Sequence, residues 1–215
     1  MNPSPYRLPM FPLGTPLLPG RLLPLRLFEP RYLALLRECL SQESPEFGVV
    51  LIERGREVGG GEQRAAVGTV AGILEATPRP SGDVSVLAVG RRRLRVVEWL
   101  PDDPHPWAMI EDWSDESDGS PAVQRTMIQD ALARVRSIAA LSGSQHGDLL
   151  DRLEESVDAF DSTTTTYALA GSVGFGASDQ HRLLLCPGVT ERLTCMMELL
   201  DDLEAVIRFH QAPNA

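Results

Sequence analysis

Lysine is absent from this sequence, and all 20 of its basic residues are arginine. The absence excludes the phosphate-binding lysine of a Walker A motif, a Schiff-base lysine and a Ser-Lys peptidase dyad. A G-x-S-x-G nucleophile motif is also missing, and the glycines of GSVGFG (171–176) have the wrong spacing for a dinucleotide-binding loop. We therefore expect no enzyme activity and no cofactor.

Cysteine and histidine are scarce. Cys39, Cys186 and Cys195 lie at unrelated spacings, which is typical of reduced thiols in a cytoplasmic protein. The four histidines form no H-x-x-x-H pair, so we expect no metal site. A histidine with a cysteine or a serine that meet only in the fold remain an alternative, and they would make the protein a hydrolase. The proline-rich N-terminus contains no apolar stretch of the kind that precedes a signal cleavage site, which favours a cytoplasmic location.

Long apolar runs and excess positive charge are also lacking. No apolar run reaches the length of a membrane span, so the sequence predicts a soluble protein. The formal net charge is −10 and the isoelectric point is about 4.9. This balance disfavours broad electrostatic binding to nucleic acid or to an anionic membrane, since both need a basic surface.

The one basic cluster is RRRLRV (91–96). An RNA or small-ligand site formed by Arg91, Arg93 and Arg95 is one interpretation. The other is a solvated strand face whose charge is neutralised by neighbouring acids, because apolar residues alternate with the last two arginines. The acidic composition favours the second interpretation, so nucleic acid is not an expected partner.

The first half of the chain, up to about Trp113, has a strand-like pattern. Short apolar runs are separated by glycine and proline, which is typical of sequential antiparallel strands that curl into a small barrel. We expect strands at 21–27, 47–53, 65–76, 83–90, 91–101 and 108–113.

A sharp corner is predicted at FEPRY (28–32). Leucines alternate along residues 21–27, but Pro24 cannot donate a ladder hydrogen bond, so this strand is expected at a sheet edge. Pro30 disfavours helical geometry at Glu29 and fits the first turn of a helix. Leucines then recur at helical spacing, so a helix should follow and pack on the sheet.

The second half has a helical pattern. SDESDGSP (114–121) is acidic and rich in turn residues, which indicates a solvated linker at 115–120. Ser178 and Thr190 are the expected N-caps of the last two helices. Helices are expected at 122–141, 148–160, 165–173, 177–186 and 191–210.

Three stretches together resemble the N-terminal substrate-binding domain of the Lon protease family, which also occurs as stand-alone proteins. Residues 8–36 match its L-P-x-F-P-L and L-P-L-x-x-F-E-P-R-Y patterns, and residues 67–96 match V-G-T-x-A-x-I and G-x-x-R-x-R. Residues 178–203 are similar to its closing helices. The resemblance covers nearly the whole chain.

The resemblance implies an α+β fold. A PUA-like antiparallel β-barrel with a packed helix would occupy residues 1–114, and an α-helical bundle would occupy residues 121–212. The family-signature residues at the corner are then scaffold: Pro24, Glu29, Pro30, Arg31 and Tyr32.

The resemblance also implies a function. In full Lon proteases this domain helps to capture unfolded or tagged polypeptides, while an ATPase module and a Ser-Lys peptidase module act on them. This chain has no lysine for either module, so a non-catalytic protein that binds unfolded or flexible polypeptides is expected. A separate protease or chaperone is a candidate partner, and no membrane is expected. The candidate peptide-binding residues are Phe11, Phe28 and Trp107.

Overall fold

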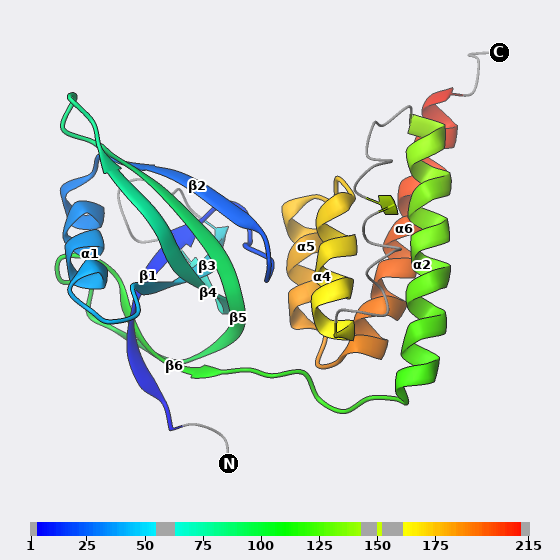
Figure 1. The fold of residues 1–215 in the computed structure, drawn as a ribbon, viewed down its shortest axis with the longest axis horizontal. Helices are drawn as coiled ribbons and strands as arrows, with labels where there is room; N and C mark the ends of the chain where they lie inside the picture. The colour runs from blue at the N-terminus through cyan, green and yellow to red at the C-terminus, as the bar shows by residue number, and fades with distance from the viewer. Residues whose placement is uncertain (1–3, 55–62, 143–149, 152–160, 212–215) are drawn as a thin grey trace. The chain divides into compact units, whose positions relative to one another are not determined.

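The computed structural model describes residues 4–54, 63–142, 150–151 and 161–211 (Figure 1). The fold combines a six-stranded sheet with helices, and the chain divides into two compact units, Met1–Ser114 and Asp115–Ala215. The first unit contains β1 (Tyr6–Leu13), β2 (Leu22–Leu27), α1 (Pro30–Leu40), β3 (Glu46–Arg54), β4 (Gln63–Pro78), β5 (Val84–Leu100) and β6 (Trp107–Asp112). The second contains α2 (Pro121–Ser142), α4 (Ser162–Ser172), α5 (Ala177–Leu185) and α6 (Val189–Gln211).

The six strands form one sheet in the order β2-β5-β4-β3-β1-β6. Strand β5 also pairs with β6, so the pairings run from β5 through β4, β3, β1 and β6 back to β5. The strands predicted at 83–90 and 91–101 are a single long strand, β5. The expectation of a wholly antiparallel sheet is wrong at one pair, because β1 and β3 are parallel.

Strand β1 was not predicted, because Pro9 and Pro12 interrupt its sequence. Among the described strands, its first half pairs with β6 alone, and Pro9 lies opposite Trp107. Its second half pairs with β3, where Pro12 lies opposite Val50. Each half therefore has a strand on one side only, which leaves an unpaired side that a proline nitrogen can face.

The corner at FEPRY is confirmed. Strand β2 lies at the sheet edge, as Pro24 requires, and α1 begins at Pro30. Glu29 is the N-cap residue, with extended φ and ψ angles of −73° and 132°. Its carboxylate accepts a hydrogen bond from Arg31 Nε at 3.0 Å, and the Arg31 guanidinium lies 4.5 Å from the centre of the Tyr32 ring. These contacts fix the direction in which α1 leaves the corner.

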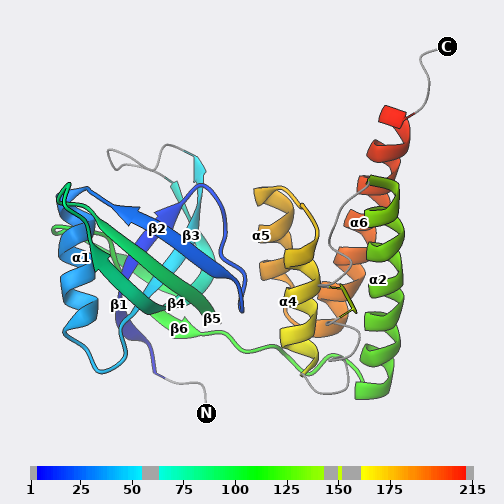
Figure 2. The same cartoon turned by 45° about the horizontal axis from the view of Figure 1, so that its top comes forward.

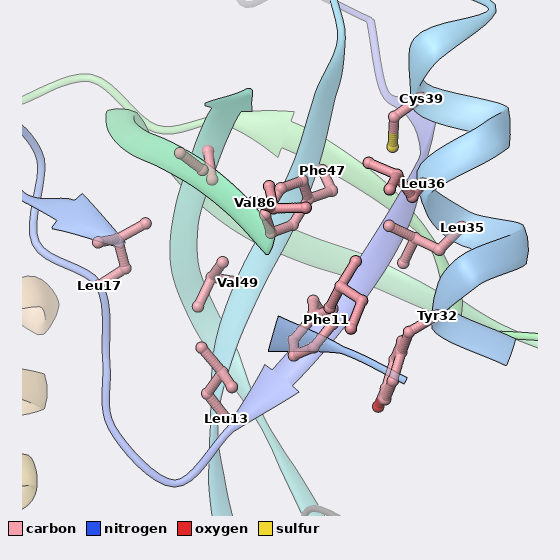
Figure 3. Packing of buried hydrophobic residues seen from close by; sticks show 13 residues of the cluster. Phe11, Leu13, Leu17, Tyr32, Leu35, Leu36, Cys39, Phe47, Val49 and Val86 are labelled. Atoms are coloured by element: carbon pink, nitrogen blue, oxygen red, sulfur yellow. The ribbon is translucent and has the colours of Figure 1, made fainter. Parts of the chain in front are cut away.

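Helix α1 covers one face of the sheet and completes the main apolar core of the first unit (Figure 3). The rings of Phe11 and Tyr32 lie 4.1 Å apart between centroids, which joins β1 directly to the helix. A second buried cluster lies around Met10, Leu94 and Ile110. The α1 side chains that enter the main core are Tyr32, Leu35, Leu36 and Cys39.

The second unit consists of helices in its described part. Helices α2 and α6 run side by side in Figures 1 and 2, α4 packs on both, and α5 packs on α6. The predicted segments 122–141, 165–173, 177–186 and 191–210 correspond to these four helices, while most of 148–160 lies outside the described residues. None of the described helices is both long and apolar enough to cross a bilayer.

Both predicted N-caps in this unit are wrong. The cap of α5 is Gly176, and Ser178 lies in the first turn. Thr190 lies inside α6, and the side chain of Asp118 caps the N-terminus of this helix instead. The Asp118 carboxylate accepts hydrogen bonds from the backbone N–H groups of Thr190 and Glu191 at 2.6 and 3.2 Å. Asp118 is 72 residues away in sequence, so local spacing could not reveal this cap.

Arg192 forms a buried ion pair with Asp115. The Arg192 side chain is fully buried, and its two terminal nitrogens lie 3.0 and 2.5 Å from the Asp115 carboxylate oxygens. Arg192 also donates to the Thr166 hydroxyl at 3.0 Å and lies over the Tyr167 ring at 4.0 Å. Two acidic side chains that were expected to be solvated, Asp115 and Asp118, are therefore bonded to helices of the second unit.

Candidate functional site

The three predicted peptide-binding aromatics have different environments. Phe11 is 7% exposed and belongs to the main core, and Trp107 is 9% exposed. Neither side chain presents a large surface to solvent, because Phe11 packs on Tyr32 and Trp107 is covered by the Arg7 guanidinium at 3.8 Å. Phe28 is 64% exposed, so it alone of the three presents most of its ring to solvent.

Phe28 borders a hollow of about 140 Å³, which we call the apolar hollow. It lies where the end of β1, the end of β2 and the first turn of α1 meet. Its rim charges are neutralised within the unit: Arg26 Nε lies 2.5 Å from an Asp83 oxygen, and Glu29 is paired with Arg31. Its apolar and aromatic lining residues are Phe11, Pro12, Leu13, Leu25, Leu27, Phe28 and Tyr32.

A second hollow, of about 630 Å³, lies beside the first half of β1, and we call it the β1 hollow. Its walls are the first half of β1, the last turn of α1, the segment 42–46 and the Trp107 side chain. Sequence reasoning missed this site, although the three glutamates of ECLSQESPE (38–46) mark it as acidic. Its polar and charged lining residues are Tyr6, Arg7, Glu38, Gln42, Glu43, Ser44 and Glu46.

Cys39 also lines the β1 hollow, but its thiol is not a nucleophile. Burial, and then the charge of Glu38, raises the pKa of Cys39 to about 12. The Cys39 Sγ donates a hydrogen bond to the Glu46 carbonyl at 3.2 Å. Nucleophilic attack needs the thiolate, which is negligible at neutral pH with this pKa. The hydrolase alternative therefore gains no support from Cys39.

Arg91 and Arg92 are paired with acids. Arg92 lies 2.9 Å from carboxylate oxygens of both Glu46 and Asp112, and its guanidinium also donates to the Tyr6 hydroxyl. Arg91 lies 3.7 Å from Glu46. The cluster therefore presents no block of uncompensated positive charge, and the RNA interpretation has no observation in its favour.

Arg93 and Arg95 share an aromatic contact. Their guanidiniums lie 4.0 and 4.3 Å from the centre of the Trp113 ring, and Arg95 lies 3.7 Å from a Glu111 oxygen. Arg93 is only 4% exposed, so its placement on a solvated strand face is wrong. The ring of Trp113 explains this burial, because it covers the planar guanidinium.

Metal ligation has no support in the described part of the chain, where no group of three histidine, cysteine, aspartate or glutamate side chains is placed to hold an ion. His105 is buried, and burial lowers the pKa of its imidazole. Its Nδ1 lies 3.2 Å from the Pro106 carbonyl, and its ring packs against Trp107 in a tilted arrangement, with 4.8 Å between centroids. These contacts give His105 a packing role beside the β1 hollow.

Comparisons with known proteins find related sequences among Lon proteases. Curated relatives include a Lon protease of Cytophaga hutchinsonii, 24% identical over 92% of this chain, and Lon protease 2 of Herpetosiphon aurantiacus, 27% identical over 66% of it. The matched regions span only 24% and 17% of those two proteins. The chain thus corresponds to a quarter or less of each relative.

Two solved structures have a similar fold. The Lon N-terminal domain protein of Xanthomonas campestris superimposes with a TM-score of 0.64 at 26% identity, covering 90% of this chain and 98% of that one. The N-terminal domain of the Mycobacterium avium complex Lon protease gives a TM-score of 0.69 at 16% identity, covering 92% and 99%, which shows the fold alone. The sequence profile of the ATP-dependent protease La (LON) substrate-binding domain matches residues 7–202. The chain therefore belongs to the LON substrate-binding domain family.

Proposed function

We propose that this chain is a non-catalytic recognition module that binds unfolded or flexible polypeptides. The observation that carries the proposal is Phe28, whose ring is 64% exposed beside the apolar hollow. Exposed aromatic side chains next to an apolar depression are typical of surfaces that bind a partner. Membership of a substrate-binding family and the complete absence of lysine agree with recognition without catalysis.

The apolar hollow favours unfolded over folded ligands. Its volume of about 140 Å³ suits a single large side chain rather than a folded element. Folded proteins bury such side chains, whereas a flexible chain can insert one between Phe28 and the end of β2. Burying one large apolar side chain contributes about 1.5–3 kcal/mol, so a single insertion gives weak, reversible binding. That affinity suits a module that samples many sequences.

We further propose that the two units are the two subdomains of the resemblance. The closed series of strand pairings from β5 back to β5 supports a PUA-like barrel over residues 1–114. The packing of α2, α4, α5 and α6 supports a helical bundle over residues 121–212, joined through 115–120. On this proposal a separate protease or chaperone receives the bound polypeptide, in the cytoplasm.

Replacing Phe28 with serine tests the proposed function. The variant should bind a fluorescently labelled, reduced and unfolded polypeptide about tenfold more weakly than the wild type, because one large apolar contact is lost. The matched control is Leu74→Ser, which removes a leucine that is 54% exposed and lies outside both hollows. The readout is fluorescence anisotropy, with the same polypeptide in its folded, disulfide-bonded form as the reference ligand.

Two results would contradict the proposed function. One is a wild-type protein that binds the unfolded polypeptide no better than the folded one at any salt concentration. The other is equal affinity of the Phe28→Ser and Leu74→Ser variants for the unfolded polypeptide, which would mean that the apolar hollow is not part of the binding site.

A further inference from the structure

The β1 hollow has an open strand edge as one wall. Residues Tyr6 to Pro9 pair with β6 on one side, and β3 begins to pair with β1 only at Met10. In the described part of the chain, no strand lies on the other side of this first half. That side faces the 630 Å³ hollow, so backbone groups of β1 are available to an extended peptide.

The opposite wall of the β1 hollow carries negative charge that is not compensated. Glu38 and Glu43 are exposed, and neither has an ion-pair or hydrogen-bond partner for its carboxylate among the described residues. The carboxylate of Glu46 is already held by Arg92. The last turn of α1 adds the negative end of its helix dipole. The one cation in the lining, Arg7, is held over the Trp107 ring at 3.8 Å.

We propose that the β1 hollow binds a basic side chain, arginine or lysine, of the polypeptide whose apolar side chain occupies the apolar hollow. This inference rests on the proposed function and adds a preference for cationic over acidic segments. Charge complementarity supports it, because two of the lining carboxylates, Glu38 and Glu43, have no ion-pair partner among the described residues of a chain of net charge −10. The hollow also has an aromatic wall, Tyr6, against which the stem of a long basic side chain can pack.

The two hollows are separated by the length of α1. The apolar hollow includes Glu29 and Tyr32 at the start of the helix, and the β1 hollow includes Glu38 and Cys39 near its end. An 11-residue helix is about 16 Å long, which an extended chain covers in about five residues. A recognised segment should therefore carry its basic residue about five positions from its large apolar residue.

The test compares three peptides of ten residues that differ at one position. Each carries the same phenylalanine, and five positions away it has arginine, citrulline or glutamate. Citrulline has nearly the shape of arginine without its charge, so it isolates the electrostatic contribution. Affinities are measured by fluorescence anisotropy at low and high salt, for the wild type and for the double variant Glu38→Gln/Glu43→Gln. The matched control, Glu75→Gln/Glu98→Gln, removes the same charge from exposed positions outside both hollows.

The expected result is that the arginine peptide binds the wild type about three- to tenfold more tightly than the citrulline peptide, with the glutamate peptide weakest. The preference should shrink at high salt and disappear in Glu38→Gln/Glu43→Gln, while the control variant keeps it. Equal binding of the arginine and citrulline peptides to the wild type, or an unchanged preference in Glu38→Gln/Glu43→Gln, would overturn the inference.

Failure of the inference is distinguishable from failure of the proposed function. If all three peptides bind equally and Phe28→Ser weakens them all, the proposed function stands and the basic-side-chain inference fails. If none of the peptides binds while the unfolded polypeptide still binds in a Phe28-dependent way, the inference fails and the proposed function stands; if the unfolded polypeptide does not bind either, both fail. A second copy of this chain in the hollow would appear as a dimer in analytical ultracentrifugation that Glu38→Gln/Glu43→Gln dissociates, and that result would also overturn the inference.

Discussion

Replacing Asp115 with alanine should destabilise the second unit more than any exposed substitution. The change removes both carboxylate contacts of Arg192, at 3.0 and 2.5 Å, and leaves a fully buried guanidinium. Among the described residues, the Thr166 hydroxyl and the face of the Tyr167 ring would remain as its partners. The expected cost follows from the desolvation of an unpaired charge, not from the strength of the pair itself.

The size of the destabilisation can be bounded from the exposed fractions of the Arg192 and Asp115 side chains. Removing one partner of a buried ion pair costs about 3–5 kcal/mol. The Asp115 side chain is 12% exposed, so water can reach the space it leaves, and we expect the lower end, about 3 kcal/mol. The double variant Asp115→Ala/Arg192→Met should recover about 1 kcal/mol or more relative to Asp115→Ala, because it also removes the buried charge.

Urea unfolding can be monitored with two spectroscopic probes that report on the two units separately. All three tryptophans, Trp99, Trp107 and Trp113, lie within residues 1–114, so their fluorescence reports the first unit. Far-UV circular dichroism is dominated by helices, most of which lie in the second unit. With a slope of about 2 kcal/mol/M, the dichroism midpoint of Asp115→Ala should fall by about 1–2 M. The matched control is Glu116→Ala, at the exposed position next along the chain.

The reasoning would be refuted by a dichroism midpoint for Asp115→Ala that equals that of Glu116→Ala. It would also be refuted if the double variant were less stable than Asp115→Ala alone, since the buried charge would then not be the source of the cost.

Three further outcomes are expected in the first unit. Gly90→Ala should cost about 1–3 kcal/mol in urea unfolding followed by tryptophan fluorescence, because a Cβ there would lie 2.5 Å from the Leu18 carbonyl oxygen; an unchanged midpoint would contradict that contact. Cys39, with a pKa of about 12, should resist a thiol reagent at pH 8 until urea unfolds the unit, and rapid native labelling by peptide mass mapping would contradict its burial. Hydrogen bonds from Ser81 and then Arg26 lower the pKa of Asp83 from 3.8 to about 2. The stability that this ionised carboxylate contributes should be present above about pH 4 and lost as the pH falls towards 2. Urea midpoints measured between pH 2 and pH 5 should therefore fall less steeply with acid in Asp83→Asn than in the wild type.

The corner of the first unit could be predicted from sequence because proline has strong local rules. Pro24 lacks an N–H, which restricts its strand to an edge, and Pro30 suits the first turn of a helix. Both rules depend only on the residue itself and its immediate neighbours. The structure places β2 at the edge and starts α1 at Pro30 accordingly.

The same residue type hid β1. Pro9 and Pro12 interrupt an apolar stretch, and by the local rule they argue against a strand. They are accommodated because β1 changes partner between them, from β6 to β3. That change is a property of the assembled sheet, so no window of the sequence contains it.

The candidate site shows a similar limit. Phe11, Phe28 and Trp107 are all large aromatics near turns or prolines, and residue type alone does not distinguish the one that is exposed. Burial of Phe11 depends on Tyr32, which α1 brings against it. The β1 hollow likewise joins residues from β1, α1 and the start of β6 that lie far apart in sequence.

The lack of lysine has a structural consequence that the count of charges alone does not reveal. Arginine has a planar fork that can hold a carboxylate with two hydrogen bonds, and this chain uses it repeatedly within itself, as in Arg192 with Asp115 and Arg64 with Asp102. Aspartate and glutamate outnumber arginine by 30 to 20. When the arginines pair with carboxylates inside the protein, some carboxylates are therefore left without an arginine partner. Glu38 and Glu43 belong to that excess. An arginine-rich stretch such as residues 91–96 therefore indicates internal ion pairing in this protein, and the charge available to a ligand is negative even close to it.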